Sequence, residues 1–99
     1  MKLPGFKIIR ETGFQITFYN GVTVSVHFGS DYSCQHQYYE RRDRIWEKYG
    51  IWDNIDAEIA IIDKDNREIT REYTGGDDEV VGWQSPEEVL EALKWAAAK

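Results

Sequence analysis

The sequence predicts an α+β fold, with an antiparallel β-sheet of four or five strands and a C-terminal α-helix packed on one face. Three observations indicate this fold. Residues 13–28 alternate apolar and polar on both sides of an Asn-Gly pair, which is typical of a β-hairpin. Residues 56–62 and 68–73 are two further runs suited to strands, with a polar turn between them. Residues 85–99 combine helix-capping signals with a helical apolar period.

The chain has 99 residues, which is enough for one domain with a modest core, so residues 1–99 are treated as a single domain. A first short strand is expected within residues 3–10, through the run Phe6–Ile9. The predicted hairpin follows it directly.

Burial of the apolar residues selects the register of that hairpin. A two-residue turn at Asn20-Gly21 would put the apolar residues of the two strands on opposite faces. A three-residue loop over 19–21 gathers them on one face and needs Gly21 in the left-handed region. It pairs Phe14 with Val26, Ile16 with Val24 and Phe18 with Val22. The outer face then holds Gln15, Thr17, Thr23, Ser25 and His27, and we expect His27 to be solvated.

The centre of the chain, around residues 30–54, is predicted to be an irregular or helical insertion. Within it, residues 37–49 contain no Pro or Gly and show helical spacing, with Gly50 as a plausible C-cap. Residues 56–62 are then expected to be a strand, 63–67 a turn and 68–73 the partner strand. A loop over 74–79 and a short last strand over 80–83 follow.

The C-terminal helix has the clearest signals in the chain. Ser85 suits the N-cap, Pro86 the first helical position, and Glu88 completes a capping box. The face expected to pack on the sheet is apolar and consists of Val89, Leu90, Ala92, Leu93, Ala96 and Ala97. Trp95 falls nearly opposite this face, so it is either covered by other segments of the chain or available to a partner.

The net charge of −6 is unevenly distributed. Residues 1–50 hold seven Lys and Arg against five Asp and Glu, whereas residues 51–99 hold five against thirteen. An acidic half disfavours direct DNA binding, because phosphate requires a cationic surface, and it suits either solubility alone or a basic protein partner. No apolar run approaches the roughly 20 residues of a membrane span. With one cysteine, Cys34, and no signal-peptide pattern, we expect a cytoplasmic protein without membrane association.

No set of residues predicts an enzyme. Cys34 and His36 are close in sequence, but that alone does not establish a thiolate–imidazole pair, and they are too few for a zinc site. The turn from Asp63 begins like a calcium loop, yet Glu68 stands where that loop needs glycine. Residues 75–79 lack the lysine and the helix of a phosphate loop. We therefore expect no catalytic residue, no metal and no cofactor.

Residues 31–52 are the strongest candidate for binding, because they combine aromatic side chains with arginines, which dominate the energetics of protein interfaces. The same residue types also stack nucleotide bases and hold phosphates, and a solvated charged face is a third interpretation. Together with the tryptophan of the last helix, the candidate binding residues are Tyr38, Tyr39, Arg41, Arg42, Arg44, Trp46, Tyr49, Trp52 and Trp95.

Several segments resemble small accessory proteins of bacteriophages and prophages. They are residues 18–29, with the pattern Asn-Gly-Val-Thr-Val-Ser-Val-His-Phe-Gly, then residues 32–34, 57–60 and 81–89, with Ser-Pro-Glu-Glu-Val. This resemblance implies a phage accessory origin, and small acidic phage proteins often inhibit bacterial defence, as anti-CRISPR proteins do. It carries over no active site.

The leading hypothesis is therefore a non-enzymatic phage counter-defence protein that binds and inhibits a host defence protein in the cytoplasm of the infected bacterium. The alternative is a binding protein that sequesters a nucleotide signal, as an oligomer. For Trp95, self-association as a homodimer and a heterologous partner both remain open.

Overall fold

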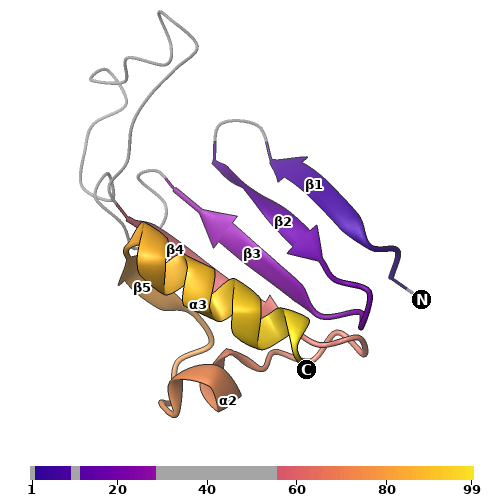
Figure 1. Ribbon diagram of the computed structural model, residues 1–99. Helices are drawn as coiled ribbons and strands as arrows, with labels where there is room; N and C mark the ends of the chain where they lie inside the picture. Colours follow the sequence, from indigo (N-terminus) through magenta and orange to yellow (C-terminus); the bar gives the residue numbers. More distant parts are fainter. Residues whose placement is uncertain (1, 10–11, 29–55) are drawn as a thin grey trace, which may run out of the picture.

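The computed structural model describes residues 2–9, 12–28 and 56–99, and these residues form two layers (Figure 1). One layer is a five-stranded sheet with the order β1-β2-β3-β4-β5, in which every neighbouring pair is antiparallel. Its strands are β1 (Gly5–Ile9), β2 (Gly13–Thr17), β3 (Thr23–His27), β4 (Ala57–Ile62) and β5 (Val81–Gln84). The other layer consists of α2 (Thr70–Thr74) and α3 (Pro86–Ala97). The predicted α+β fold is confirmed, and the predicted insertion over 30–54, with its helix over 37–49, lies outside the described residues.

The β2–β3 hairpin has the register that burial favours. Ile16 lies opposite Val24, and the N–H of Phe18 donates to the carbonyl oxygen of Val22 at 2.9 Å. Gly21 has a φ of +84°, as the three-residue loop requires. The register and the turn predicted from the sequence are both confirmed.

Asn20 fastens the tip of this hairpin to the C-terminal end of α3. Its side-chain oxygen accepts from the N–H of Val22 at 2.9 Å, and its Nδ2 donates to the carbonyl oxygen of Ala96 at 2.8 Å. The last carbonyl groups of a helix lack intrahelical partners, so such a bond is available there. The residue that shapes the turn therefore also fixes the end of the helix.

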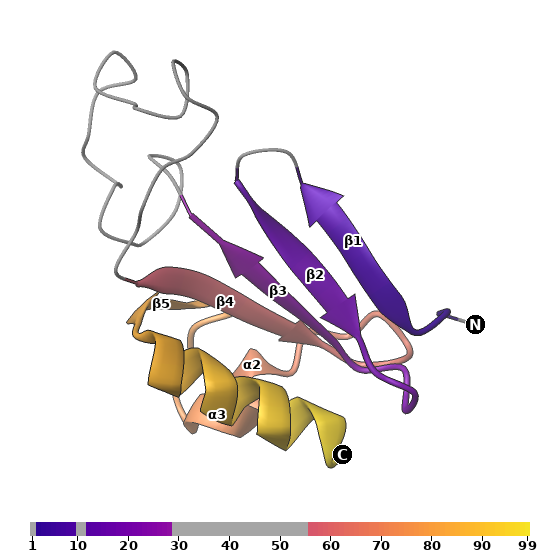
Figure 2. The same cartoon turned by 45° about the horizontal axis from the view of Figure 1, so that its top comes forward.

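The core lies between α3 and the strands β3 and β4. Val24, Ile59 and Ile61 are fully buried on the sheet side, and Ala92 and Ala96 are fully buried on the helix side. Because both helix residues are small, α3 can lie close to the sheet. Figure 1 shows α3 lying over the sheet, roughly along β4, with α2 on one side of it and β1 on the other, and Figure 2 shows the helix and the sheet as separate layers.

The N-terminus of α3 is capped as predicted, but the helix is rotated relative to the predicted apolar face. Ser85 Oγ accepts from the N–H of Glu88 at 3.2 Å, and the Glu88 carboxylate accepts from the N–H of Ser85 at 3.0 Å. Leu90, predicted to be buried, is 49% exposed, whereas Trp95, predicted to lie opposite, packs against the core. The physical reason is that Tyr73 of α2 covers the flank of the helix that carries Trp95.

The prediction of a strand over 68–73 is wrong. After the turn that follows β4, the N–H of Ile69 donates to the carbonyl of Ile61 at 2.8 Å, and the chain then enters α2. The next position of the ladder is occupied by a side chain, because Thr70 Oγ1 accepts from the N–H of Ile61 at 2.9 Å. The place beside β4 is taken by β5 instead. The turn over 63–67 is confirmed, since Asp63 Oδ1 accepts from the N–H groups of two of its residues.

The outer face of β3 is largely buried, and His27 is less solvated than predicted. Thr23 is 5% exposed and Ser25 is 3% exposed, and His27 is half-buried. Both hydroxyl groups have partners on β2, since Thr17 Oγ1 lies 2.8 Å from that of Thr23 and Gln15 Nε2 donates to Ser25 at 3.5 Å.

Candidate functional site

Of the nine predicted binding residues, the structure describes only Trp95. The other eight belong to residues 31–52 and lie outside the described residues, so their role stays a prediction.

Trp95 has contacts within the chain. Its ring centroid lies 5.3 Å from that of Tyr73, and Lys99 Nζ lies 4.8 Å from the centroid of the indole. Lys99 is also paired with Glu72 at 2.9 Å, which ties the end of the chain to α2. Burial raises the pKa of Tyr73, with further contributions from the charges of acidic residues on α3. These contacts give Trp95 a packing role, and its role in binding a partner stays a prediction.

The described part of the sheet has an apolar area that α3 does not cover. The helix packs mainly on β3, β4 and β5. On the same face, Phe6 and Ile8 are 73% and 75% exposed. They belong to β1, the edge strand that α3 does not cover (Figure 2). In the ladder they lie opposite Ile16 and Phe14 of β2, which pack against the core. The apolar face of the sheet therefore extends beyond the helix, onto β1.

β1 also has backbone groups that no described strand uses. The N–H of Phe18 donates across the hairpin, and hydrogen-bonded positions alternate along an antiparallel strand. The backbone groups of the even-numbered residues of β2 therefore bond to β3, and those of the odd-numbered residues bond to β1. Lys7 lies opposite Gln15, so the odd-numbered residues of β1 bond back to β2. The N–H and C=O groups of Phe6 and Ile8 consequently point away from the sheet. The same two residues offer both exposed apolar side chains and outward-pointing peptide groups.

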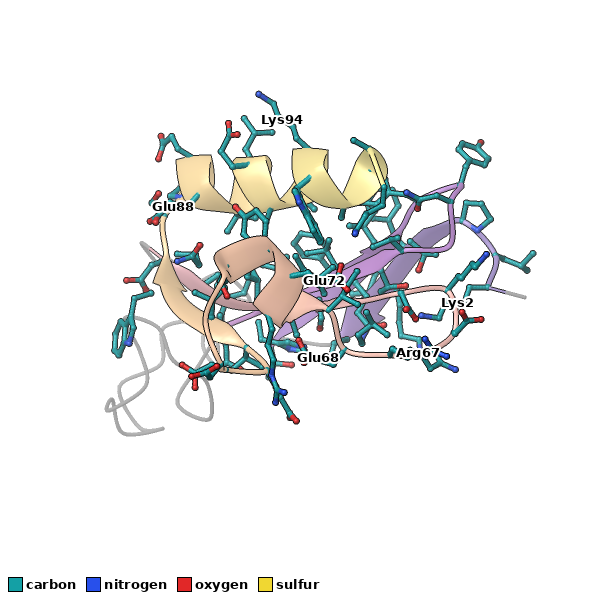
Figure 3. The ribbon with its side chains drawn as sticks, turned by 90° about the horizontal axis from the view of Figure 1, so that it is seen from below. Lys2, Arg67, Glu68, Glu72, Glu88 and Lys94 are labelled. Atoms are coloured by element: carbon teal, nitrogen blue, oxygen red, sulfur yellow. The ribbon has the colours of Figure 1, made fainter. Side chains whose placement is uncertain are left out.

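A second candidate lies on the opposite face of the sheet, where a groove of about 490 Å³ is open. Its polar lining includes Lys2, Lys7, Gln15, Thr17 and Thr23. Lys2 Nζ donates to the carbonyl oxygen of Asp63 at 2.7 Å, and Figure 3 shows Lys2 and Arg67 at the same end of the molecule. The pKa of the Asp63 carboxyl is lowered, first by the backbone N–H of Arg67 and further by the charges of Arg67 and Lys2. In an acidic chain, this face offers cationic groups to an anion.

Ser25 and His27 form a hydrogen-bonded pair on the same face of β3, through Ser25 Oγ and His27 Nε2. Burial lowers the pKa of His27, and the charge of Glu58 and a bond to the backbone of Thr12 oppose that shift. A hydroxyl beside an imidazole can begin a nucleophilic pair, but Ser25 is only 3% exposed, so a substrate does not reach it in this conformation. Among the described residues, no group of three His, Cys, Asp or Glu side chains could hold a metal ion.

Trp83 is an unusual residue on the other edge strand. Its φ is +58°, and its side chain is 49% exposed. The β4–β5 register shifts between Ala57 and Ile59, which marks a β-bulge beside Trp83. A large side chain in the left-handed region is strained, so the surrounding ladder must hold it there.

Comparison with family models, curated proteins and solved structures found no match to this chain. No helix in residues 2–9, 12–28 or 56–99 is long and apolar enough to cross a membrane.

The sequence interpretation missed the apolar area on β1 and the groove beneath the sheet. A signal for the first was present, because Phe6 and Ile8 flank Lys7 with the alternation of a one-sided strand. What the sequence did not predict is that α3 would lie over the other end of the sheet. The groove combines residues from β1, β2 and β3 with the segment before β1, and no local pattern brings these together.

Proposed function

We propose that this chain is a non-enzymatic binding protein that docks a protein partner on β1. The observation that carries this proposal is the coincidence, at Phe6 and Ile8, of exposed apolar side chains and outward-pointing peptide groups. We call these two side chains and the outer backbone edge of β1 the β1 surface. The resemblance to phage accessory proteins supplies the setting. There the partner is a host defence protein in the bacterial cytoplasm, and docking inhibits it.

The energetics support such a role for the β1 surface. Burying a fully exposed Phe or Ile side chain contributes about 1.5–3 kcal/mol. Phe6 and Ile8 are about three-quarters exposed, so together they contribute about 2–4.5 kcal/mol to a complex. A micromolar complex requires about 8 kcal/mol in total. The difference has to come from further contacts made by the partner.

The test compares proteins captured from bacterial lysate by the wild type, Phe6→Ser, Ile8→Ser and Val80→Ser. Val80 is the matched control, because it is an exposed apolar residue, 39% accessible, next to the opposite edge strand. The expected result is a partner that the wild type and Val80→Ser retain and that both β1 variants lose. The purified partner should then bind with 1:1 stoichiometry in calorimetry. Capture that is indifferent to Phe6 and Ile8 would contradict the proposal.

A second candidate function, the sequestration of a nucleotide signal, is favoured by the groove that contains Lys2 and Lys7. Its volume lies in the range of small-molecule sites, and ammonium and hydroxyl groups are suitable partners for a phosphate. Arg41 and Arg44, predicted from the sequence as binding residues, lie outside the described residues.

Calorimetry with a panel of cyclic nucleotides tests this second function. A nucleotide-binding protein should release heat with a defined stoichiometry per chain or per oligomer, and Lys7→Ala and Arg41→Ala should weaken or abolish binding. The absence of heat across the panel, together with a captured protein partner, decides for the protein-binding function.

A further inference from the structure

We propose that β1 binds its partner by strand addition, and that the added strand is antiparallel and carries an acidic residue between two apolar ones. This inference rests on the proposed protein-binding function and names the partner's chemistry. The contact would extend the sheet by one strand beyond β1.

The backbone of β1 sets the register of such a strand. Phe6 and Ile8 direct their N–H and C=O groups outward, so each would form a hydrogen-bonded pair with the residue opposite it. Two such pairs, two residues apart, define a three-residue recognition unit. The partner residues opposite Phe6 and Ile8 point to the same face as those side chains, where the sheet is apolar and uncovered. Apolar residues therefore suit both positions.

Lys7 sets the chemistry of the middle position. It points to the opposite face, which is polar and where it lines the groove with Gln15 and Thr17. The partner residue opposite Lys7 forms a pair without hydrogen bonds, in which the side chains approach most closely. An acidic residue there gains from the opposite charge, whereas a basic one is repelled.

The same geometry disfavours two of the registers in which a second copy of this chain could pair with β1. In one such register, Phe6 of each copy lies opposite Ile8 of the other. The two-fold axis then passes beside Lys7, so the lysines of the two copies lie face to face. A two-fold centred on Phe6 sets Ile8 opposite Pro4, which has no N–H to donate. Lysine and proline on edge strands are common means by which proteins prevent pairing with themselves.

The probe is a labelled peptide, Thr-Thr-Val-Glu-Val-Thr-Thr, with a control peptide that has Lys in place of the central Glu. NMR titration of the full chain measures affinity and amide exchange together. In the free protein, the amides of Phe6 and Ile8 should exchange fast and that of Lys7 slowly. On binding the Glu peptide, only the Phe6 and Ile8 amides should become protected. The Glu peptide should bind about three- to tenfold more tightly than the Lys peptide, and Lys7→Glu should reverse that preference.

Ile8→Pro separates strand addition from simple apolar docking. The N–H of Ile8 points outward, so proline there costs the sheet no ladder bond but blocks the added strand. We expect Ile8→Pro to abolish peptide binding and Ile8→Ala only to weaken it, with circular dichroism showing both variants folded. If Ile8→Pro binds as Ile8→Ala does, strand addition is wrong, while docking of a partner on the Phe6 and Ile8 side chains still stands. If the peptide does not bind and partner capture ignores Phe6, the proposed function is wrong as well. Phe6 and Ile8 amides that are protected before peptide is added would overturn the inference, in favour of a second copy if the protein is dimeric.

Discussion

The hydroxyl of Thr70 accepts a hydrogen bond from the backbone N–H of Ile61 at 2.9 Å, and both residues are fully buried. This bond occupies the place where a sheet ladder would continue. The bond joins β4 to the first residue of α2. Substitution of Thr70 can measure how much this bond contributes to the stability of the fold.

Thr70→Val should lower the free energy of unfolding by about 1–3 kcal/mol, because the substitution keeps the shape of the side chain but leaves a buried N–H without its acceptor. Thr70→Ser is the matched control, since it keeps the hydroxyl group and removes a methyl group. Urea denaturation measures both. A Thr70→Val protein as stable as the wild type would mean that the Ile61 N–H finds another partner.

Trp95→Ala should lower the free energy of unfolding by about 2 kcal/mol or more, because Trp95 packs on the core and against Tyr73. A double-mutant cycle with Tyr73→Ala should give a coupling energy of about 0.5–1.5 kcal/mol. Light scattering on the same proteins tests the binding role. A wild-type dimer that Trp95→Ala converts into a stable monomer would assign this tryptophan to an interface.

Two glycines with nearly the same φ allow the cost of backbone strain to be separated from the cost of a steric clash. Gly13 has a φ of +146° and Gly5 one of +141°. A Cβ on Gly13 would lie 2.0 Å from the carbonyl oxygen of Val26, whereas a Cβ on Gly5 meets nothing within 4 Å. Gly5→Ala should cost about 1–2 kcal/mol, from strain alone, and Gly13→Ala clearly more. Equal losses in thermal unfolding would argue against the tight approach of β2 and β3 at Gly13.

Trp83→Gly should be more stable than Trp83→Ala by about 1 kcal/mol, because glycine adopts a positive φ without strain. At an ordinary strand position the order is reversed, since glycine weakens strands. Both variants lose the same indole, so the comparison isolates the backbone. Denaturant midpoints that favour alanine would indicate that residue 83 does not hold a positive φ in solution.

The stability of the fold should fall as the pH is lowered from neutral through 6.5, because burial lowers the pKa of His27 below that ordinary value. In this window the unfolded chain binds more protons than the folded one, so acidification favours unfolding. Protonation of Asp63, whose pKa is also lowered, acts only near and below its ordinary value of 3.8. His27→Gln should remove the loss of stability that begins as the pH falls through 6.5. His36 is present in both proteins, so the difference reports His27 alone.

Local patterns predicted those parts of the fold whose signals lie within a few residues. The Asn20-Gly21 pair and the alternation around it specified both the hairpin and its register, because a shift by one residue would have put the apolar side chains of the two strands on opposite faces. Ser85 and Glu88 specified the start of the last helix, because a capping box is a contact between neighbours. Residues 68–73 were predicted to be a strand from their local pattern. That pattern did not show that the Thr70 side chain would accept from the distant backbone N–H of Ile61.

The sequence by itself determined the α+β class, the hairpin, the turn after β4 and the start of α3, since each depends on short-range sterics and local hydrogen bonds. Only the tertiary structure decided the rotation of α3, which follows from Tyr73 covering Trp95. It also decided which part of the sheet the helix covers. The apolar face spans four strands or more, and a single helix covers only part of that width. Phe6 and Ile8 are therefore exposed not because of their own sequence but because of where α3 comes to rest.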